Sequence, residues 1–584
     1  MPESALRRGQ ATEMSAQRQI SSEGYRGRFP LLSTGARWPL LSRTRPDRIV
    51  TVASLSKRIP DEFIVRTLAR RLTEETDARV LLLHLERVDR SLTLRDWARV
   101  APRVNGEFCF APHLEFLAPR AERLHMRIDE GGTTEFVTPV STSSSSMLGE
   151  MLDHFTRHYH YVIVHVAVEA SEPLLLECFA KSDRTFLLLQ PTSADLYQRD
   201  LLLREMRTLG KGENVKTIIC REKGEEHFNE LLKQMGSAVH GFVHDCPAVA
   251  SAQNLDDWNE NAFRGDIGRL AREIAHKRVG LALSSGGARG LAHIGVIQVL
   301  EENGIEVDVI AGCSMGSYVG SVWAYGYDGL AMERLAREVE HRWGLLELID
   351  PFILPRQGFL RGEKVKRRLK RSISDVHFSE LVRPLRIVAT NLSTLEREIF
   401  SSGEVAAAVH ASSAIPGACV PVKIDGELYI DGGIADPLPV DVLEEMGIER
   451  IIAVNTIPTA AYLRCRHEME RDHAEVTGRR RHKIRAIINE YLNYFAPGNI
   501  LDTILRSFHG AQMRVAEISC LHADLVLRPL SFDGRWHDFR RPGKYIALGR
   551  REAEEHLAEI QALVNRKEPT HELETAEEPV ATLT

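Results

Sequence analysis

The fold of this chain is decided by VDVIAGCSMG, residues 307–316, an apolar run that leads into a glycine–serine turn. The apolar run 307–311 predicts a buried strand, and the apolar residues after the turn predict a helix. Gly312 and Gly316 flank Ser314 in the pattern G-x-S-x-G. Small residues at these positions let the backbone turn sharply, so that the serine hydroxyl projects from the turn. A helix amino terminus also favours developing negative charge. The segment therefore predicts a nucleophile elbow with Ser314 as the nucleophile.

A glycine-rich turn, SGGARG, lies upstream at residues 285–290, between an expected strand at 279–283 (VGLAL) and a helix. Its glycine spacing departs from the G-x-G-x-x-G of dinucleotide-binding loops. Glycine relaxes the steric limits on the backbone, so neighbouring amides can turn toward one point. The turn therefore favours an oxyanion hole, with a purely structural tight turn as the alternative. The residues expected to supply it are Gly286, Gly287, Ala288, Arg289 and Gly290.

A third motif, YIDGG, places Asp431 at the end of an expected strand at 427–430, before Gly432 and Gly433. Asp-Gly-Gly is a frequent turn by itself. Alone, it indicates only a chain reversal with a carboxylate at its start.

Taken in this order, the three motifs resemble the patatin-like phospholipase family. Three further stretches are similar to that family: AAAVHASSAIPGACVPV at 406–422, LRIVATNL at 385–392 and DGGIADPLPV at 431–440. The resemblance is strong over 278–455 and looser over 500–565. Within the family, the chain looks most similar to the bacterial and neuropathy-target-esterase-like branch.

The resemblance implies a three-layer α/β/α domain that hydrolyses carboxylic esters of phospholipids or lysophospholipids through an acyl-enzyme. It implies that Ser314 attacks and that Asp431 accepts its proton without a histidine, and it requires no cofactor or metal. Two residues depart from the family pattern. Ser285 stands where the family has its first loop glycine, and Asp436 stands where relatives often have asparagine.

An aspartate needs help to act as a base, because its ordinary pKa is about 3.9. A dry site would raise that pKa and strengthen the hydrogen bond to the serine hydroxyl. The competing arrangement is a triad in the order Ser, Asp, His, in which His522 or His537 would follow Asp431. His410 and His293 are further candidates. None of the four lies in a motif that would place it as a base, so we expect all four to be packed or surface residues.

Strands and helices also alternate upstream. The runs 48–54 (RIVTVAS), 79–85 (RVLLLHL), 161–168 (YVIVHVAV), 185–190 and 216–220 predict strands, and 62–76 predicts a helix. This alternation predicts a separate parallel-sheet α/β domain over 47–275, with helices on both faces.

The order of elements upstream resembles the MinD-like P-loop ATPases. The segment where that family has its phosphate loop is LSKRIPDE, residues 55–62, which contains no glycine and no Lys-Ser/Thr pair. Pro60 also removes one amide donor. Because the phosphate cradle depends on such amides, we expect a degenerate domain that hydrolyses no nucleotide.

The remaining sequence sets the organisation of the chain. A domain core at 278–455 is followed by a charged helical insertion at 456–499 and the rest of the catalytic domain at 500–565. The polar ends, 1–46 and 566–584, are expected to be a disordered basic arm and a disordered tail. A formal net charge of −6 is too small to indicate nucleic acid. Eight cysteines without a C-x-x-C pair are typical of a reducing compartment.

No apolar run reaches the ~20 residues that a membrane span needs, so we expect a cytoplasmic protein with at most peripheral membrane contact. Two basic stretches, 356–371 (RQGFLRGEKVKRRLKR) and 479–485 (RRRHKIR), could rest on anionic headgroups or be solvated helix faces. Besides the lipid esterase, two other classes stay open. One is a non-catalytic regulatory or scaffold protein, and the other is a nucleotide-driven ATPase, which the missing phosphate loop disfavours.

Overall fold

The structure is a computed structural model. It describes residues 47–87, 103–104, 107–108, 114–118, 121–128, 147–168, 172–222, 239–246, 261–340, 350, 359–465, 468, 500–531, 534 and 537–566. The amino-terminal arm, almost all of the carboxy-terminal tail, most of the charged insertion and the basic stretch 479–485 lie outside these residues. Residues 47–584 form one compact unit that contains two large sheets.

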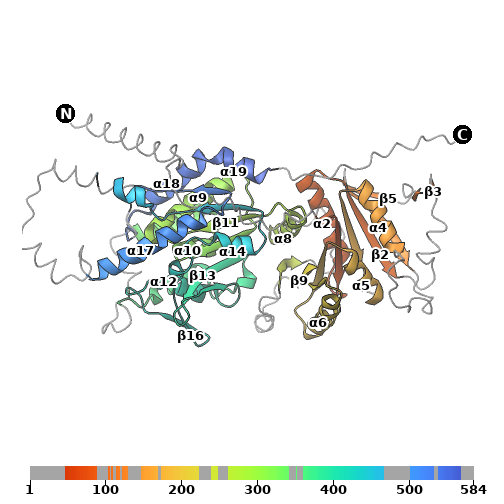
Figure 1. The fold of residues 1–584 in the computed structure, drawn as a ribbon, viewed down its shortest axis with the longest axis horizontal. Helices are drawn as coiled ribbons and strands as arrows, with labels where there is room; N and C mark the ends of the chain where they lie inside the picture. Colours follow the sequence, from red (N-terminus) through yellow and green to blue (C-terminus); the bar gives the residue numbers. More distant parts are fainter. Residues whose placement is uncertain are drawn as a thin grey trace, which may run out of the picture. The chain divides into compact units, whose positions relative to one another are not determined.

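The upstream sheet has eight strands (Figure 1). Their order is β10 (Gly241–Cys246), β9 (Val215–Glu222), β8 (Arg184–Leu189), β1 (Ile49–Ser54), β7 (Tyr161–Val166), β2 (Val80–Arg87), β6 (Ala121–Ile128) and β5 (Leu114–Ala118). Neighbouring strands are parallel except for β5 and β6, which pair antiparallel at one edge. The parallel sheet predicted from the strand–helix alternation is confirmed, while β5, β6 and β10 were not predicted.

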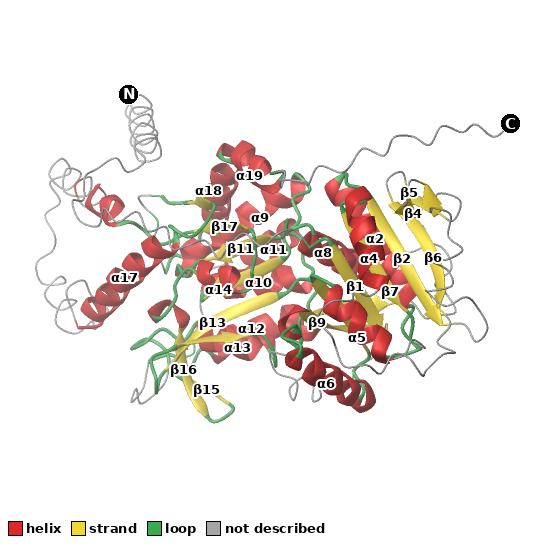
Figure 2. Ribbon diagram, turned by 45° about the vertical axis from the view of Figure 1, so that its right-hand side comes forward, coloured by secondary structure: helices red, strands yellow, loops and turns green. Residues whose placement is uncertain are grey.

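Helices cover both faces of this sheet (Figure 2). One buried apolar cluster joins the sheet to α2 (Asp61–Thr76) and α8 (Asn261–Ile274). A second cluster joins the other face to α4 (Met147–His158), α5 (Glu172–Lys181) and α6 (Ser193–Thr208). Two separate clusters are what a parallel sheet buried on both sides produces, because alternate side chains of each strand point to opposite faces.

The downstream sheet has parallel strands at its centre and antiparallel strands at one side. Its order is β15 (Val422–Ile424), β16 (Glu427–Asp431), β13 (Leu385–Asn391), β12 (Val309–Cys313), β11 (Val279–Leu283), β17 (Arg450–Val454) and β18 (Leu525–Leu527), and β14 (Arg397–Phe400) also pairs with β13. The pairs that join β13, β12, β11, β17 and β18 are parallel. The strands β14, β15 and β16 pair antiparallel.

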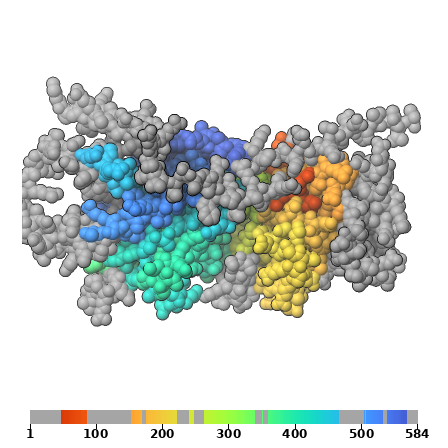
Figure 3. Space-filling model, viewed as in Figure 1, coloured from red at the N-terminus to blue at the C-terminus, as the bar shows by residue number. Residues whose placement is uncertain are grey.

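Helices again form a layer on each face. The larger apolar cluster includes α9 (Ala292–Glu302), α10 (Met315–Tyr325), α12 (Glu363–Ile373), α13 (Val405–Ser412) and α18 (Pro542–Glu555). The other cluster includes α14 (Val440–Glu445) and α17 (Ile500–Ser519). The predicted three-layer α/β/α architecture is confirmed. Part of α17 lies on the molecular surface in Figure 3.

One predicted boundary was wrong. The strand expected from residue 307 begins at Val309, because Asp308 instead accepts a hydrogen bond from Val279 N–H (2.8 Å) and pairs with Arg272 (2.8 Å). The helical end of the described chain consists of two helices, α18 and α19 (Leu557–Val564), separated at His556. His556 leaves helical geometry with φ −103° and ψ 10°. None of the helices that the structure describes is long and apolar enough to cross a membrane.

Candidate active site

Ser314 occupies the turn between β12 and α10. Its φ of 52° and ψ of −117° are strained for a residue with a side chain. The turn is tight, because a Cβ added at Gly316 would lie 2.2 Å from the carbonyl oxygen of Leu283. A glycine at 316 thus lets the elbow approach the neighbouring strand β11. Ser314 itself is 6% exposed, at the amino terminus of α10.

The glycine turn follows β11, which is the parallel neighbour of β12. It forms a short 3₁₀ helix, Gly287–Leu291, and leads into α9. A Cβ at Gly290 would lie 2.5 Å from Cγ of Met315, the residue after the serine, so the turn packs directly against the elbow. The first amides of a helix have no intrahelical acceptor. The amides of Gly287 and Ala288, at the start of this 3₁₀ helix, therefore have no acceptor within it.

Asp431 comes from the far side of β13. In the sheet register, Cys313 of β12 is opposite Val388 of β13, and the next residue, Ala389, is opposite Asp431 of β16. The antiparallel strand β16 therefore ends at the level where β12 ends, although 117 residues separate the serine from the aspartate. The register brings the elbow and the Asp-Gly-Gly turn to one edge of the sheet.

The two side chains meet. Ser314 Oγ donates a hydrogen bond of 2.8 Å to Asp431 Oδ2, and Gly433 N–H donates one of 2.8 Å to Asp431 Oδ1. Asp431 is 1% exposed. Burial raises the pKa of Asp431 to about 6, and the hydrogen bonds from the Gly433 amide and the Ser314 hydroxyl oppose that rise. The carboxylate is thus a stronger base than a solvated aspartate.

Ser412 is a neighbour of the elbow that the sequence reasoning missed. It is fully buried at the end of α13, and its Oγ accepts a hydrogen bond from Ser314 N–H (2.8 Å). The same hydroxyl donates to the carbonyl oxygen of Val388 (2.6 Å). Ser412 thereby ties the strained residue to β13. The serine is visible within the alanine-rich segment 406–422, but nothing in that segment indicates that it would bond to the Ser314 backbone.

Residues from distant segments brace the glycine turn. Thr456 N–H donates to Ser284 Oγ (2.9 Å), and Thr456 Oγ1 donates to the carbonyl oxygen of Ser285 (3.0 Å). From α17, Gln512 Nε2 lies 3.4 Å from Ser285 Oγ. A Cβ at Gly433 would lie 1.9 Å from the same Nε2. Gln512 therefore lies between the glycine turn and the Asp-Gly-Gly turn, with Ser285 as its polar contact.

The four histidines lie elsewhere. His522 is about half exposed and pairs with Glu444 (3.1 Å), and His537 is exposed. His410 Nε2–H donates to the carbonyl oxygen of Arg361 (3.1 Å). His293 is buried, and its Nε2–H donates to the carbonyl oxygen of Ser284 (3.0 Å). In the hydrogen bonds recorded for the described residues, the partners of the Asp431 carboxylate are Ser314 and Gly433 rather than a histidine.

Two other sequence expectations concern charged residues. Asp436 is buried and pairs with Arg397 (3.2 Å); burial and the nearby Asp441 raise its pKa to about 7. Within the basic stretch 356–371, the helix α12 directs Lys370 to Glu404 (2.8 Å), so this cation has a partner within the protein.

Comparison with known proteins agrees with the motifs. Residues 281–444 match the family model "Patatin-like phospholipase", which confirms the resemblance seen in the sequence. Lysophospholipase nte1 of Aspergillus fumigatus is 35% identical over 231 residues, 39% of this chain and 15% of that protein. An uncharacterized NTE family protein of Mycobacterium bovis is 44% identical over 185 residues, 32% of this chain and 50% of that protein. The chain thus spans half or less of these relatives.

Solved structures are similar only distantly. VipD from Legionella pneumophila is 16% identical with a TM-score of 0.24, over 49% of this chain and 67% of that one. The MinD cell division protein of Aquifex aeolicus is 11% identical with a TM-score of 0.27, over 39% of this chain and 96% of that one. At TM-scores this low, the likeness supports no conclusion about the fold, which rests on the strand order and register of the two sheets themselves.

Proposed function

Because residues 281–444 form a patatin-like phospholipase domain, we propose that this chain is a serine-dependent lipid esterase that cleaves carboxylic esters of phospholipids or lysophospholipids. The observation that carries the proposal is the 2.8 Å hydrogen bond from Ser314 Oγ to the buried carboxylate of Asp431. Nucleophilic catalysis requires such contact between a hydroxyl and a base. Relatives named as lysophospholipases support the substrate class.

The chemistry begins with Ser314 Oγ attacking the ester carbonyl carbon while Asp431 Oδ2 takes the hydroxyl proton. Collapse of the tetrahedral intermediate breaks the bond to the alcohol oxygen, which leaves with the proton from Asp431. A water molecule then attacks the acyl-enzyme, Asp431 takes its proton, and the carboxylic acid is released as Ser314 is restored. Asp431 must be ionised when the serine attacks the ester and again when water attacks the acyl-enzyme. Since its pKa is raised to about 6, kcat/KM falls as the pH falls through about 6.

The negative charge on the carbonyl oxygen would be stabilised by the amides at Gly286, Gly287, Ala288, Arg289 and Gly290. The amide donors are fixed before the substrate arrives, because Gly290 packs against Met315 and Thr456 braces the turn. Donors that need no rearrangement as charge develops are the most effective kind. The positive end of α10 adds to this field.

The test is labelling and turnover with Ser314→Ala. The purified full chain is treated with a fluorophosphonate probe and assayed on p-nitrophenyl butyrate and on lysophosphatidylcholine. We expect Ser314→Ala to lose labelling and to lower kcat by at least ~10³-fold on both substrates. The matched control is Ser393→Ala, in an exposed turn. Equal labelling of the wild type and Ser314→Ala would exclude Ser314 as the nucleophile, and a wild type without turnover would favour the scaffold alternative.

A further inference from the structure

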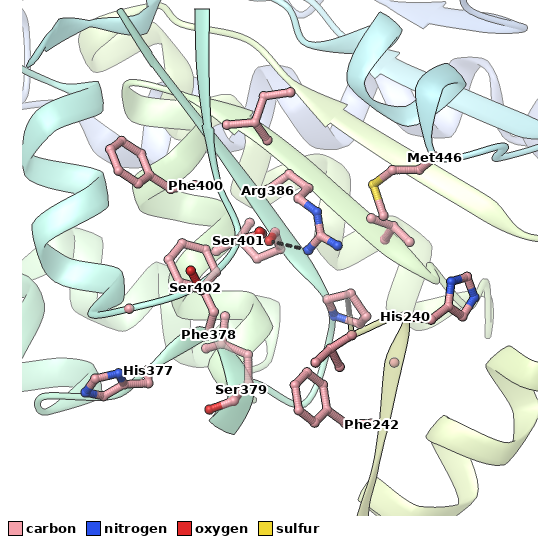
Figure 4. Close-up of a pocket in the computed structure, with 18 of the residues that line it drawn as sticks. His240, Phe242, His377, Phe378, Ser379, Arg386, Phe400, Ser401, Ser402 and Met446 are labelled. Atoms are coloured by element: carbon pink, nitrogen blue, oxygen red, sulfur yellow. Dashed lines mark hydrogen bonds between the residues drawn. The ribbon is translucent and has the colours of Figure 1, made fainter. Parts of the chain in front are cut away.

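A cavity of about 1140 Å³ lies away from the serine–aspartate pair, and neither Ser314 nor Asp431 lines it. One side is made by β9, β10 and α8 of the upstream part, and the other by β13, β14 and the start of α13 (Figure 4). Ligand cavities in proteins typically measure ~300–1,000 Å³. This one is large enough for a ligand of substantial size.

Arg386 is the cation at the centre of the cavity. Figure 4 shows its guanidinium between Ser401 on one side and Met446 and His240 on the other. Its Nη1 donates to the carbonyl oxygen of Leu385 (3.0 Å). Among the described residues, no carboxylate lies within ion-pair distance of it. Burial lowers the pKa of Arg386 to about 10. A guanidinium has five N–H donors, and the bond to Leu385 uses one of them.

A desolvated cation without a counter-ion is costly, and the usual remedy is a bound anion. Most carboxylates around the cavity cannot serve, because they already pair with other cations. The pairs are Asp266 with Arg269 and His244, Glu273 with Arg184, Arg278 and His240, Asp308 with Arg272, Glu404 with Lys366 and Lys370, and Glu445 with Arg397. Lys216, on β9, adds a second lining cation with no ion pair recorded among the described residues.

The rest of the lining combines apolar and aromatic side chains with polar and charged ones. Phe242 comes from β10, Phe378 from the short 3₁₀ helix Phe378–Glu380 before β13, and Phe400 from β14. Ser401 and Ser402 place two hydroxyls on the same wall. A cation without a counter-ion in the same cavity as three aromatic rings fits a molecule that has an anionic head and an apolar body.

We propose that this cavity binds an amphipathic anion, with its carboxylate or phosphate head on Arg386 and its apolar body against Phe242, Phe378 and Phe400. The guanidinium offers paired N–H donors to either head group, and the two serine hydroxyls can donate to its remaining oxygens. The site is independent of the esterase reaction, because it shares no lining residue with the serine–aspartate pair.

The test is calorimetric titration of the full chain carrying Ser314→Ala, so that no turnover occurs. The probes are decanoate, decyl phosphate and, as the uncharged match, decanol. We expect at least one anion to bind with a stoichiometry of one and decanol to bind at least ~10-fold more weakly, the loss of one charged hydrogen-bonding interaction. Binding of only one anion identifies the head group. Binding of neither anion overturns the proposal.

Three variants in the same background locate the site. Arg386→Gln is expected to weaken anion binding by ~10-fold or more, Arg386→Lys by less, and Arg551→Gln, an exposed control on α18, not at all. Unchanged affinity in Arg386→Gln overturns the proposal. A measurement on the unmutated chain covers the case in which Arg386→Gln does not fold. Decanoate, but not decanol, should protect Arg386 from phenylglyoxal in peptide mass spectra, and absence of protection overturns the proposal.

Discussion

Each of the two sheets has a central strand followed by a loop and a helix, but the residues of the two loops differ. In each, a buried central strand ends in a loop that leads to a helix, at the sheet edge where α/β proteins bind ligands. After β11 the loop is rich in glycine and packs against the elbow. After β1 the loop has no glycine, Pro60 lacks an N–H, and α2 begins with Asp61 and Glu62. Acidic residues at a helix amino terminus occupy the positive end that an anion would need. The fold thus offers a position, and the loop residues decide whether chemistry occurs there.

The greatest loss of activity is expected when a carboxylate of the downstream site is changed rather than one that follows the upstream loop. Asp431→Asn keeps the size of the side chain and its acceptor for Gly433 N–H but removes the base. We expect kcat/KM for p-nitrophenyl butyrate to fall by ~10³-fold or more. Asp61→Asn, at the start of α2, should leave it unchanged. Comparable losses in both variants would show that the upstream loop takes part in the reaction and would break the comparison.

The next effect concerns space around the glycine turn. A Cβ at Gly286 would lie 2.1 Å from Oγ1 of Thr456, so Gly286→Ala should displace the turn and lower kcat by ~10²-fold, the scale of losing one oxyanion donor. Thr456→Ala removes that oxygen and should restore part of the activity when combined with Gly286→Ala. A double variant no more active than Gly286→Ala alone would mean that the glycine acts through something other than this contact.

A third effect appears in stability rather than turnover. The pKa of Asp431 is raised from 3.8 to about 6 in the folded chain, so its contribution to stability is fully present below 3.8 and is lost as the pH rises through about 6. Asp431→Asn escapes that loss. We measure how far its free energy of unfolding in urea exceeds that of the wild type. This excess should be about 2 kcal/mol larger near pH 8 than near pH 4. If the difference between the two free energies of unfolding does not vary with pH, the carboxyl of Asp431 is not buried with a raised pKa. Asp61→Asn is the matched control.

The smallest effect tests the brace behind the elbow. Ser412→Ala removes the acceptor of Ser314 N–H and should lower kcat by ~10-fold with little change in KM, because it leaves a buried donor unpaired beside the nucleophile. The adjacent Ser413→Ala is the control. Equal kcat values for the two variants would show that the strained elbow holds its shape without Ser412.

Much of the molecule could be predicted from local sequence. The strands at 49–54 and 279–283 are short apolar runs bounded by turn residues, and periodicity locates such runs well. The residues that we propose for the chemistry, Ser314, Asp431 and the glycine turn, lie in motifs whose residue types are specific to sharp turns. The start of β12 was misplaced, because the buried ion pair of Asp308 with Arg272 has no signature in the residues around it.

What remained beyond prediction depends on contacts between segments far apart in the chain. Ser412, Thr456 and Gln512 reach the site from a helix, the end of a strand and a later helix, and nothing in their own neighbourhoods indicates it. Residue types alone indicate which turns could carry a nucleophile, a base and an oxyanion hole, because those depend on the steric limits of single residues. The packed structure alone shows that β16 ends level with β12 and that Arg386 lines a cavity in which no carboxylate of the described residues pairs with it. Sheet register and burial are properties of the whole packed chain.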